Sequence, residues 1–273
     1  MVVHHQIIVA HLLEYKNYLQ LKGYKTQTVK HSIAYVKEYL EYQNKEPCTL
    51  SQYFKYLENR PNKNHPKLKL GKSTLNGVIL ALEKYFNYLE FVKKQPIIPC
   101  KVPYYKFTRK QIEYLTVKEV QKLFDCVIDL PHKAVLTCLY HLGLRASEVI
   151  NLKTKDIDLK KNLVFIAGSK TGHQRYVPIN KTAKQILRNY LKLHIEYYLF
   201  KGVYKEQSNT HYLQKIVKKY AKEAGITKRV YPHLLRHSIA THLLQQGMQL
   251  EKIAQFLGHN SLDSTHRYTH FNQ

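Results

Sequence analysis

The sequence predicts a mainly α-helical chain of two domains, with a small β-sheet in the second domain. Apolar residues recur at helical spacing along most of its 273 residues, a length that suits two separate cores. The stretch 95–107 carries three prolines, resists helix formation and divides the helical pattern. The segments 163–167 and 175–179 are short and rich in β-branched or aromatic residues, which is typical of strands.

The chain is strongly basic. It has 44 lysines and arginines against 19 acidic residues, a formal charge of +25 that would repel itself without a polyanionic partner. No apolar run approaches the roughly 20 residues that cross a bilayer, and the N-terminus lacks the features of a secretion signal. We therefore expect a cytoplasmic protein that binds nucleic acid and has no membrane association.

The cysteines predict neither a disulfide nor a metal site. Cys48, Cys100, Cys126 and Cys138 form no CxxC pair and lack the spacing of a zinc ribbon. We expect reduced thiols that mostly serve packing. No metal ion and no cofactor is predicted for the chain.

The first domain, residues 1–95, is predicted to be all helical. Its helices are expected at 4–22, at about 28–42, from Thr49 to just before Pro61, and at about 73–93. Thr49 and Gln52 have the spacing of a capping box. The segment 61–72 is predicted to be a basic loop that suits backbone phosphates.

Residues 96–111 are predicted to link this domain to a second one at 112–273. There, Thr116 and Glu119 form another capping-box spacing, and helices are expected to follow as far as Leu142. The two strand segments should form a hairpin around GSKTGHQ. After residue 181 the helical period returns, so the second domain should be mostly α with a small sheet.

The C-terminal half holds residue types that suit cleavage of a phosphodiester, which needs a nucleophile, cations for the phosphate oxygens and an acid for the leaving group. In HLGLRASEVINL, Gly143 should end one helix and Arg145 should open the next, where a phosphate could be held. By itself Arg145 also fits a surface or packing arginine. Glu148 should pair with Arg145 or cap the backbone.

A predicted helix in YPHLLRHSIATHLL gathers further cations. Pro232 suits its first turn, and His233, Arg236 and His237 fall within an arc of about 100° at helical spacing. The neighbouring apolar face should pack against the core. His233 and His237 are also spaced like two zinc ligands, but Leu234 stands where the zinc-protease motif has glutamate, and we expect His237 to be structural.

Two candidates lie on less regular segments. Lys170 falls at the tip of the predicted hairpin, where it could protonate a departing oxygen or be a solvated turn residue. The last segment should be a helix ending near Gly258, followed by a turn of helix that carries Tyr268, nine residues after His259. Because the chain has 23 tyrosines, chemistry alone does not select one as nucleophile.

Taken together and in order, these residues resemble the signature of the tyrosine recombinase, or phage integrase, family. The resemblance covers about residues 112–270, and the helical first domain is similar to the family's core-binding domain. The two-domain plan is most similar to Xer-like and small mobile-element recombinases. The matching positions are Arg145 in GLRASE, Lys170 in the hairpin, His233 and Arg236 in HLLRH, His259 in LGH and Tyr268 in RYTH.

The resemblance implies a site-specific DNA recombinase, active through a 3′-phosphotyrosine bond. It implies a clamp of two domains around double-stranded DNA and a tetramer on paired sites, either of one protein or with a second recombinase. Arg145 and Arg236 would then hold the scissile phosphate, with hydrogen bonds to it from the two histidines, His233 and His259. Lys170 would be the general acid and Tyr268 the nucleophile, with no metal or high-energy cofactor.

Three alternatives compete with this interpretation. A type IB topoisomerase-like enzyme would use the same residue types but would relax supercoils without pairing two sites. A catalytically silent DNA-binding regulator would keep the basic surface and the fold, but none of the six positions is missing here. A general nucleic-acid-binding helical protein would explain the charge and not the ordered motifs.

Overall fold

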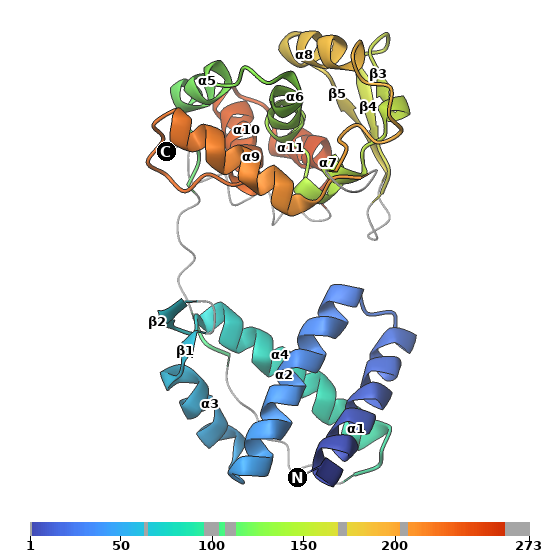
Figure 1. Ribbon diagram of the computed structural model, residues 1–273, viewed down its shortest axis with the longest axis vertical. Helices are drawn as coiled ribbons and strands as arrows, with labels where there is room; N and C mark the ends of the chain where they lie inside the picture. The colour runs from blue at the N-terminus through green and yellow to red at the C-terminus, as the bar shows by residue number, and fades with distance from the viewer. Residues whose placement is uncertain are drawn as a thin grey trace. The chain divides into compact units, whose positions relative to one another are not determined.

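The computed structural model divides the chain into two compact units, Met1–Arg109 and Lys110–Gln273 (Figure 1). The structure describes residues 2–62, 65–95, 104–106, 113–168, 174–202 and 207–259, and the side chains of these except 2–7 and 65–67.

The described part of the first unit contains four helices packed around an aliphatic and aromatic core. Tyr15, Tyr53, Tyr85 and Tyr88 are buried there among leucines and valines. The capping box at the third helix is present, because the Thr49 N–H donates to Gln52 Oε1 at 2.8 Å. The helices, α1 Val2–Leu21, α2 Thr26–Lys45, α3 Leu50–Asn59 and α4 Lys72–Phe91, match the predicted ones to within a few residues.

The prediction of a basic loop at 61–72 is wrong in part. It contains two short antiparallel strands, β1 Pro61–Asn62 and β2 His65–Lys69. The alternation of lysine and leucine in PKLKL has the period of a strand, but the two prolines hide it. Pro61 is tolerated because it is the first residue of its strand.

The described residues of the predicted linker pack on α4 of the first unit. Asn76 donates from Nδ2 to the Tyr105 carbonyl at 3.0 Å and accepts the Tyr105 N–H at 2.8 Å. The Tyr104 hydroxyl donates to Glu83 at 2.6 Å. Residues 96–103 and 107–112 of this stretch, including Cys100, lie outside the described residues.

The second unit is mostly helical, with the sheet at one side (Figure 1). The capping box predicted at its first helix is present, since the Thr116 N–H donates to Glu119 Oε2 at 2.7 Å. Its helices begin with α5 Val117–Asp125, α6 Leu130–Leu139 and α7 Ala146–Asn151, and continue with α8 Lys181–Leu191, α9 Thr210–Glu223, α10 Pro232–Gln245 and α11 Leu250–Leu257.

The sheet confirms the predicted hairpin and adds a strand to it. Strands β4 Leu163–Ile166 and β5 Arg175–Pro178 pair antiparallel, and Ile166 lies opposite Arg175. A third strand, β3 Ile157–Asp158, pairs with the outer edge of β4. It was not predicted because two residues are too short to show a period. The hairpin loop at 169–173, and with it Lys170, lies outside the described residues.

The helical period was predicted to return after residue 181 and to continue to the end of the chain. The described residues between α8 and α9, however, form no further helix. This segment instead exchanges backbone hydrogen bonds with the chain after α7. The Thr154 N–H donates to the Tyr197 carbonyl at 3.0 Å, and the Leu199 N–H donates to the Leu152 carbonyl at 2.8 Å. Burial of Leu199 and Phe200 stabilises this pairing, a tertiary effect that a local pattern does not show.

A buried serine fixes the entry of the chain into the second unit. Ser238 Oγ on α10 accepts the Leu115 N–H at 2.8 Å and donates to the Leu234 carbonyl at 2.8 Å. Replacing Ser238 with alanine leaves that N–H buried and unpaired, so we expect Ser238→Ala to lower the free energy of unfolding by about 1 to 3 kcal/mol. Urea denaturation measures this, with the exposed Thr182→Ala as control. Equal stability of the two variants would contradict the assignment.

Two further features bear on function. Cys48, Cys126 and Cys138 are free thiols, and Cys138 is fully buried. Within the described ranges, no helix is long and apolar enough to span a bilayer.

Candidate active site

Four of the six predicted site residues lie within the described residues, and the structure brings them together. Arg145 precedes α7, His233 and Arg236 lie on α10, and His259 follows α11. Arg145 and Arg236 both face Glu148, and Arg145 also donates to the carbonyl of Gly258, the residue before His259. Besides burial, the charges of the two arginines, of His237 and of His233 lower the pKa of His259, which agrees with a single cluster. Lys170 and Tyr268 lie outside the described residues.

Arg145 is the N-cap residue of α7, as its place after Gly143 predicted. Gly143 has a φ of 58°, and a Cβ there would lie 2.9 Å from the side chains of Phe256 and Leu257, so glycine lets α11 approach this turn. The Arg145 guanidinium donates from Nη2 to the Gly258 carbonyl at 2.7 Å. About a third of its side chain, 34%, stays exposed, which leaves it accessible to a ligand.

Arg236 is held more deeply than Arg145. Its side chain is only 1% exposed. The guanidinium donates from Nη1 to the Gly143 carbonyl at 2.6 Å and from Nη2 to the Leu257 carbonyl at 2.7 Å. These bonds orient a planar fork of donors in a fixed direction before any ligand arrives.

Glu148 is the buried carboxylate that these arginines share. Arg145 donates to it from both the backbone N–H, at 2.8 Å, and Nη1, at 2.9 Å, so the predicted pairing and capping are both present. Nη1 of Arg236 lies 3.8 Å from Oε2. Burial alone would raise the pKa of Glu148, but hydrogen bonds and charge from Arg175, with help from Arg145 and Arg236, lower the pKa to about 2.

Arg175, at the start of β5, is a member of the cluster that the sequence analysis missed. Its Nη1 and Nη2 donate to the two oxygens of Glu148 at 2.8 and 3.0 Å, and its Nε donates to the Phe256 carbonyl at 3.1 Å. One signal was present in the sequence. Arg175 is two residues before Val177, so alternation along the strand assigns both to the buried face.

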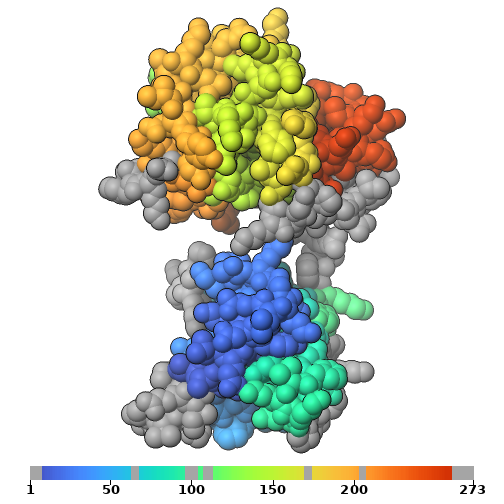
Figure 2. Space-filling model, turned by 90° about the vertical axis from the view of Figure 1, so that its right-hand side faces the viewer, coloured from blue at the N-terminus to red at the C-terminus, as the bar shows by residue number. Residues whose placement is uncertain are grey.

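The end of α11 provides backbone carbonyls that bind the same three arginines as Glu148. Gly258 ends the helix with a φ of 64°, as its position predicted. The last carbonyls of a helix form the negative end of its dipole and lack partners within the helix. Here three consecutive carbonyls accept from three arginines: Phe256 from Arg175, Leu257 from Arg236, and Gly258 from Arg145. Figure 2 shows this last described part of the chain, in red, against the yellow segment that contains the strands.

The cluster is positively charged. Three guanidinium groups face the carboxylate of Glu148, so two positive charges remain after pairing. His259 adds none at neutral pH, because burial and the charges of Arg236 and Arg145 lower its pKa to about 3. The neutral imidazole can donate one hydrogen bond and accept another. The arrangement suits an anion that is held by charge and by directed donors.

His233 and His237 form an edge-to-face pair on α10, with ring centroids 4.5 Å apart and planes at 79°. His233 is exposed and His237 is half-buried. Across the ranges that the structure describes, no group of three or more histidine, cysteine or acidic side chains is arranged to hold a metal ion. The spacing that resembles a pair of zinc ligands therefore has no third ligand within these ranges.

The depressed pKa of His259 predicts how acid affects stability. The folded protein binds a proton at His259 less readily than the unfolded chain, whose histidine has the ordinary value of 6.5. The stabilisation from neutral His259 is therefore complete above about pH 6.5 and declines as the pH falls towards 3. We expect the difference in unfolding free energy between wild type and His259→Gln to shrink over this range. The same difference at pH 7 and pH 5 would contradict this.

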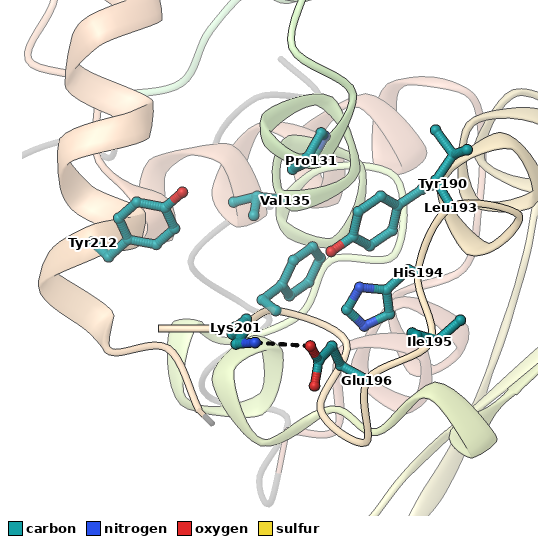
Figure 3. A pocket seen from close by; sticks show the side chains of 10 residues that line it. Pro131, Val135, Tyr190, Leu193, His194, Ile195, Glu196, Lys201 and Tyr212 are labelled. Atoms are coloured by element: carbon teal, nitrogen blue, oxygen red, sulfur yellow. Dashed lines mark hydrogen bonds and ion pairs between the residues drawn. The ribbon is translucent and has the colours of Figure 1, made fainter. Parts of the chain in front are cut away.

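A separate cavity of about 310 Å³ lies away from the arginine cluster. Apolar and aromatic side chains such as Val135, Tyr190 and Phe200 line it, and an ion pair joins Lys201 to Glu196 beside them (Figure 3). None of the four site residues that the structure describes borders this cavity. The candidate active site is therefore the exposed part of the arginine cluster rather than this cavity.

The family model that matches the chain is that of the phage integrase family, over residues 113–273. Among curated proteins, the tyrosine recombinase XerA of Pyrococcus horikoshii is 34% identical, covering 94% of this chain and 88% of its own. The tyrosine recombinase XerC of Thermodesulfovibrio yellowstonii is 32% identical, covering 81% of this chain and 82% of its own.

Solved structures show the same fold. A crystal structure of XerA recombinase aligns with a TM-score of 0.56 at 26% identity, covering 96% of this chain and 94% of the other. XerH recombinase, in a post-cleavage complex with a palindromic difH substrate, aligns with a TM-score of 0.74 at 20% identity, covering 98% and 86%.

The fold and the cluster of arginines and histidines define an enzyme of the kind that acts on a phosphodiester. The chain belongs to the phage integrase family, the tyrosine recombinases. The resemblance found in the sequence is thereby confirmed.

Proposed function

We propose that the chain is a site-specific DNA recombinase that cuts and rejoins DNA strands through a 3′-phosphotyrosine bond at Tyr268. The observation that carries this proposal is the convergence of Arg145 and Arg236, each fixed by carbonyls at the turn before α7 or at the end of α11. The family membership and the spacing of the six motif residues support it further.

In this proposal the two arginines bind the scissile phosphate. The partly exposed Arg145 binds one non-bridging oxygen, and the guanidinium of the buried Arg236 binds the other. Their positions are set before the substrate binds, so little reorganisation is needed as negative charge builds on the oxygens. His233 and the neutral His259 each donate a hydrogen bond to the same phosphate.

The covalent step follows from these contacts. The phenolic oxygen of Tyr268 gives its proton to solvent and attacks phosphorus, and the bond from phosphorus to the 5′ oxygen breaks. Lys170 gives that oxygen a proton, so the strand leaves as a 5′-hydroxyl. Rejoining is the reverse reaction with the 5′-hydroxyl of another strand. One ester replaces another, so the step needs no external energy source.

The proposed partner is double-stranded DNA. Residues 1–95 would serve as a DNA-binding domain and 112–273 as the catalytic domain, joined by the linker at 96–111. A charge of +25 on the chain suits a polyanion, and XerH was solved with its difH substrate. We further propose a cytoplasmic enzyme that acts as a tetramer on paired sites, formed by this chain alone or with a second recombinase.

A product assay tests the proposal. Source DNA fragments that stay attached to the protein after boiling in SDS are sequenced to find the target site, and two copies of that site are placed on a supercoiled plasmid. A recombinase yields deleted or inverted products. Relaxed plasmid without rearrangement would favour topoisomerase-like activity, and binding without any product would favour a silent regulator.

A further inference from the structure

We propose that Arg175 is a positioning residue for strand cleavage, which ties the start of β5 to the end of α11 through Glu148. This rests on the function proposed above, because it concerns the placement of the groups that cleave. The sequence motifs of the family resemblance do not include Arg175.

The contacts of Arg175 that the structure shows are all made to the protein. Nη1, Nη2 and Nε all donate to protein acceptors, the two oxygens of Glu148 and the Phe256 carbonyl. Only 10% of its side chain is exposed, compared with 34% for Arg145. Arg175 therefore acts on the protein, whereas Arg145 keeps surface for a ligand.

Through Glu148, Arg175 acts on both phosphate-binding arginines. Oε1 of Glu148 accepts from Arg145 at 2.9 Å and from Arg175 at 2.8 Å. Without Arg175, the buried carboxylate would lose two charge-assisted hydrogen bonds and would be free to turn towards Arg145 or Arg236. Either movement would shift a donor that the substrate requires.

Arg175 also fits closely against the backbone that follows α11. A Cβ at Gly258 would lie 2.8 Å from Nη1 of Arg175, and Gly258 has a left-handed φ of 64°. The chain continues from there directly to His259 and, ten residues after Gly258, to Tyr268. In the other direction, Arg175 comes five residues after Lys170.

The Arg175 guanidinium thus joins β5, which follows Lys170 in the sequence, to the end of α11, which precedes Tyr268 in the sequence. The sheet alone does not make this connection, because β5 pairs only with β4 among the described strands. The hydrogen bond from Nε to the Phe256 carbonyl links β5 directly to α11. Its loss should loosen the end of α11 while the rest of the core remains packed.

Two variants and one control test this proposal in the full-length protein. Arg175→Gln removes the charge, and Arg175→Lys keeps a charge but loses the planar fork that makes all three contacts. Arg188→Gln, at an exposed position on α8, is the control. Hydrogen exchange is followed at the Gly258 and His259 amides, which donate to the Gln255 and Ala254 carbonyls. The rate of SDS-stable adduct formation is measured on the duplex mapped from source DNA, at saturating protein.

Both Arg175 variants should exchange faster at Gly258 and His259 and form adduct about 100-fold more slowly, a loss that a misplacement of reacting groups by about 1 Å can cause. Their affinity for the duplex should stay unchanged, and Arg188→Gln should match wild type in every measurement. Unchanged exchange at these amides would overturn the proposal. So would a wild-type cleavage rate per folded molecule, which would mean that Arg175 serves stability alone.

The exchange measurement needs no DNA, so it separates this proposal from the proposed function. If wild-type protein forms no adduct but the Arg175 variants loosen the end of α11, the recombinase proposal fails and the contact role of Arg175 stands without a role in cleavage. If wild type forms adduct and Arg175→Lys forms it at the wild-type rate, the recombinase proposal stands and the positioning role fails.

Discussion

Tyr268→Phe should bind its DNA with wild-type affinity and form no SDS-stable adduct. The substitution removes only the phenolic oxygen, which in the proposed mechanism forms the bond to phosphorus, and it keeps the aromatic ring. No other group in the proposed mechanism attacks phosphorus, so the loss should be complete within detection. Adduct yield on gels, with binding measured in parallel, checks this.

A matched control for that experiment is Tyr176→Phe. Tyr176 is on β5 and its side chain is largely exposed, so its hydroxyl should not matter for cleavage. Adduct that survives Tyr268→Phe at the wild-type level would assign the nucleophile to another tyrosine. Loss of DNA affinity along with adduct would show that the residue serves binding.

The second large effect is expected for Arg236→Lys, which keeps the positive charge but not the fork. A lysine has a single ammonium group, so it cannot bond the Gly143 and Leu257 carbonyls and also face a phosphate in the geometry of the guanidinium. Loss of a preorganised donor at a developing oxyanion typically costs about 10² to 10³ in rate. Single-turnover cleavage at saturating protein measures this loss.

Folding must be checked for this variant because Arg236 is buried. Circular dichroism and thermal unfolding establish the folded fraction, and the rate is expressed per folded molecule. Arg188→Lys, exposed on α8, should cleave like wild type. An Arg236→Lys enzyme that cleaves at the wild-type rate would remove Arg236 from the proposed mechanism.

Local signals in the sequence predicted much of the fold. The capping boxes at Thr49 and Thr116 depend on residues three apart, and both are present as expected. Pro232 in the first turn of α10 and Gly258 after α11 also mark helix ends through their own backbone preferences. Each of these features is decided within a few residues, which is why a single sequence reveals it.

The features that the sequence did not predict depend on distant contacts. Strand β3 forms because β4 provides an edge, and the described residues between α8 and α9 are not helical because residues 197–199 pair with the chain near Leu152. Neither has a period long enough to detect. The partners of Glu148 come from the N-cap of α7, from β5 and from α10, so only its pairing with Arg145, three residues away, was foreseen.

The candidate site shows the same division. The motifs placed Arg145, His233, Arg236 and His259 in the sequence, and the structure brings them into one cluster. What holds the cluster together was not visible, because Arg145 and Gly258 are 113 residues apart in the chain. Arg175 was missed for the same reason, although its place on the inward face of a strand marks it as unusual for a charged residue.

The most direct test of the proposed mechanism is to identify the residue that is linked to DNA. Wild-type protein is trapped on its mapped duplex, the adduct is digested with protease and nuclease, and the nucleotide-bearing peptide is sequenced by mass spectrometry. The mechanism predicts a single modified residue, Tyr268 out of 23 tyrosines, joined to a 3′-phosphate. Attachment at another residue, or through a 5′-phosphate, would contradict it.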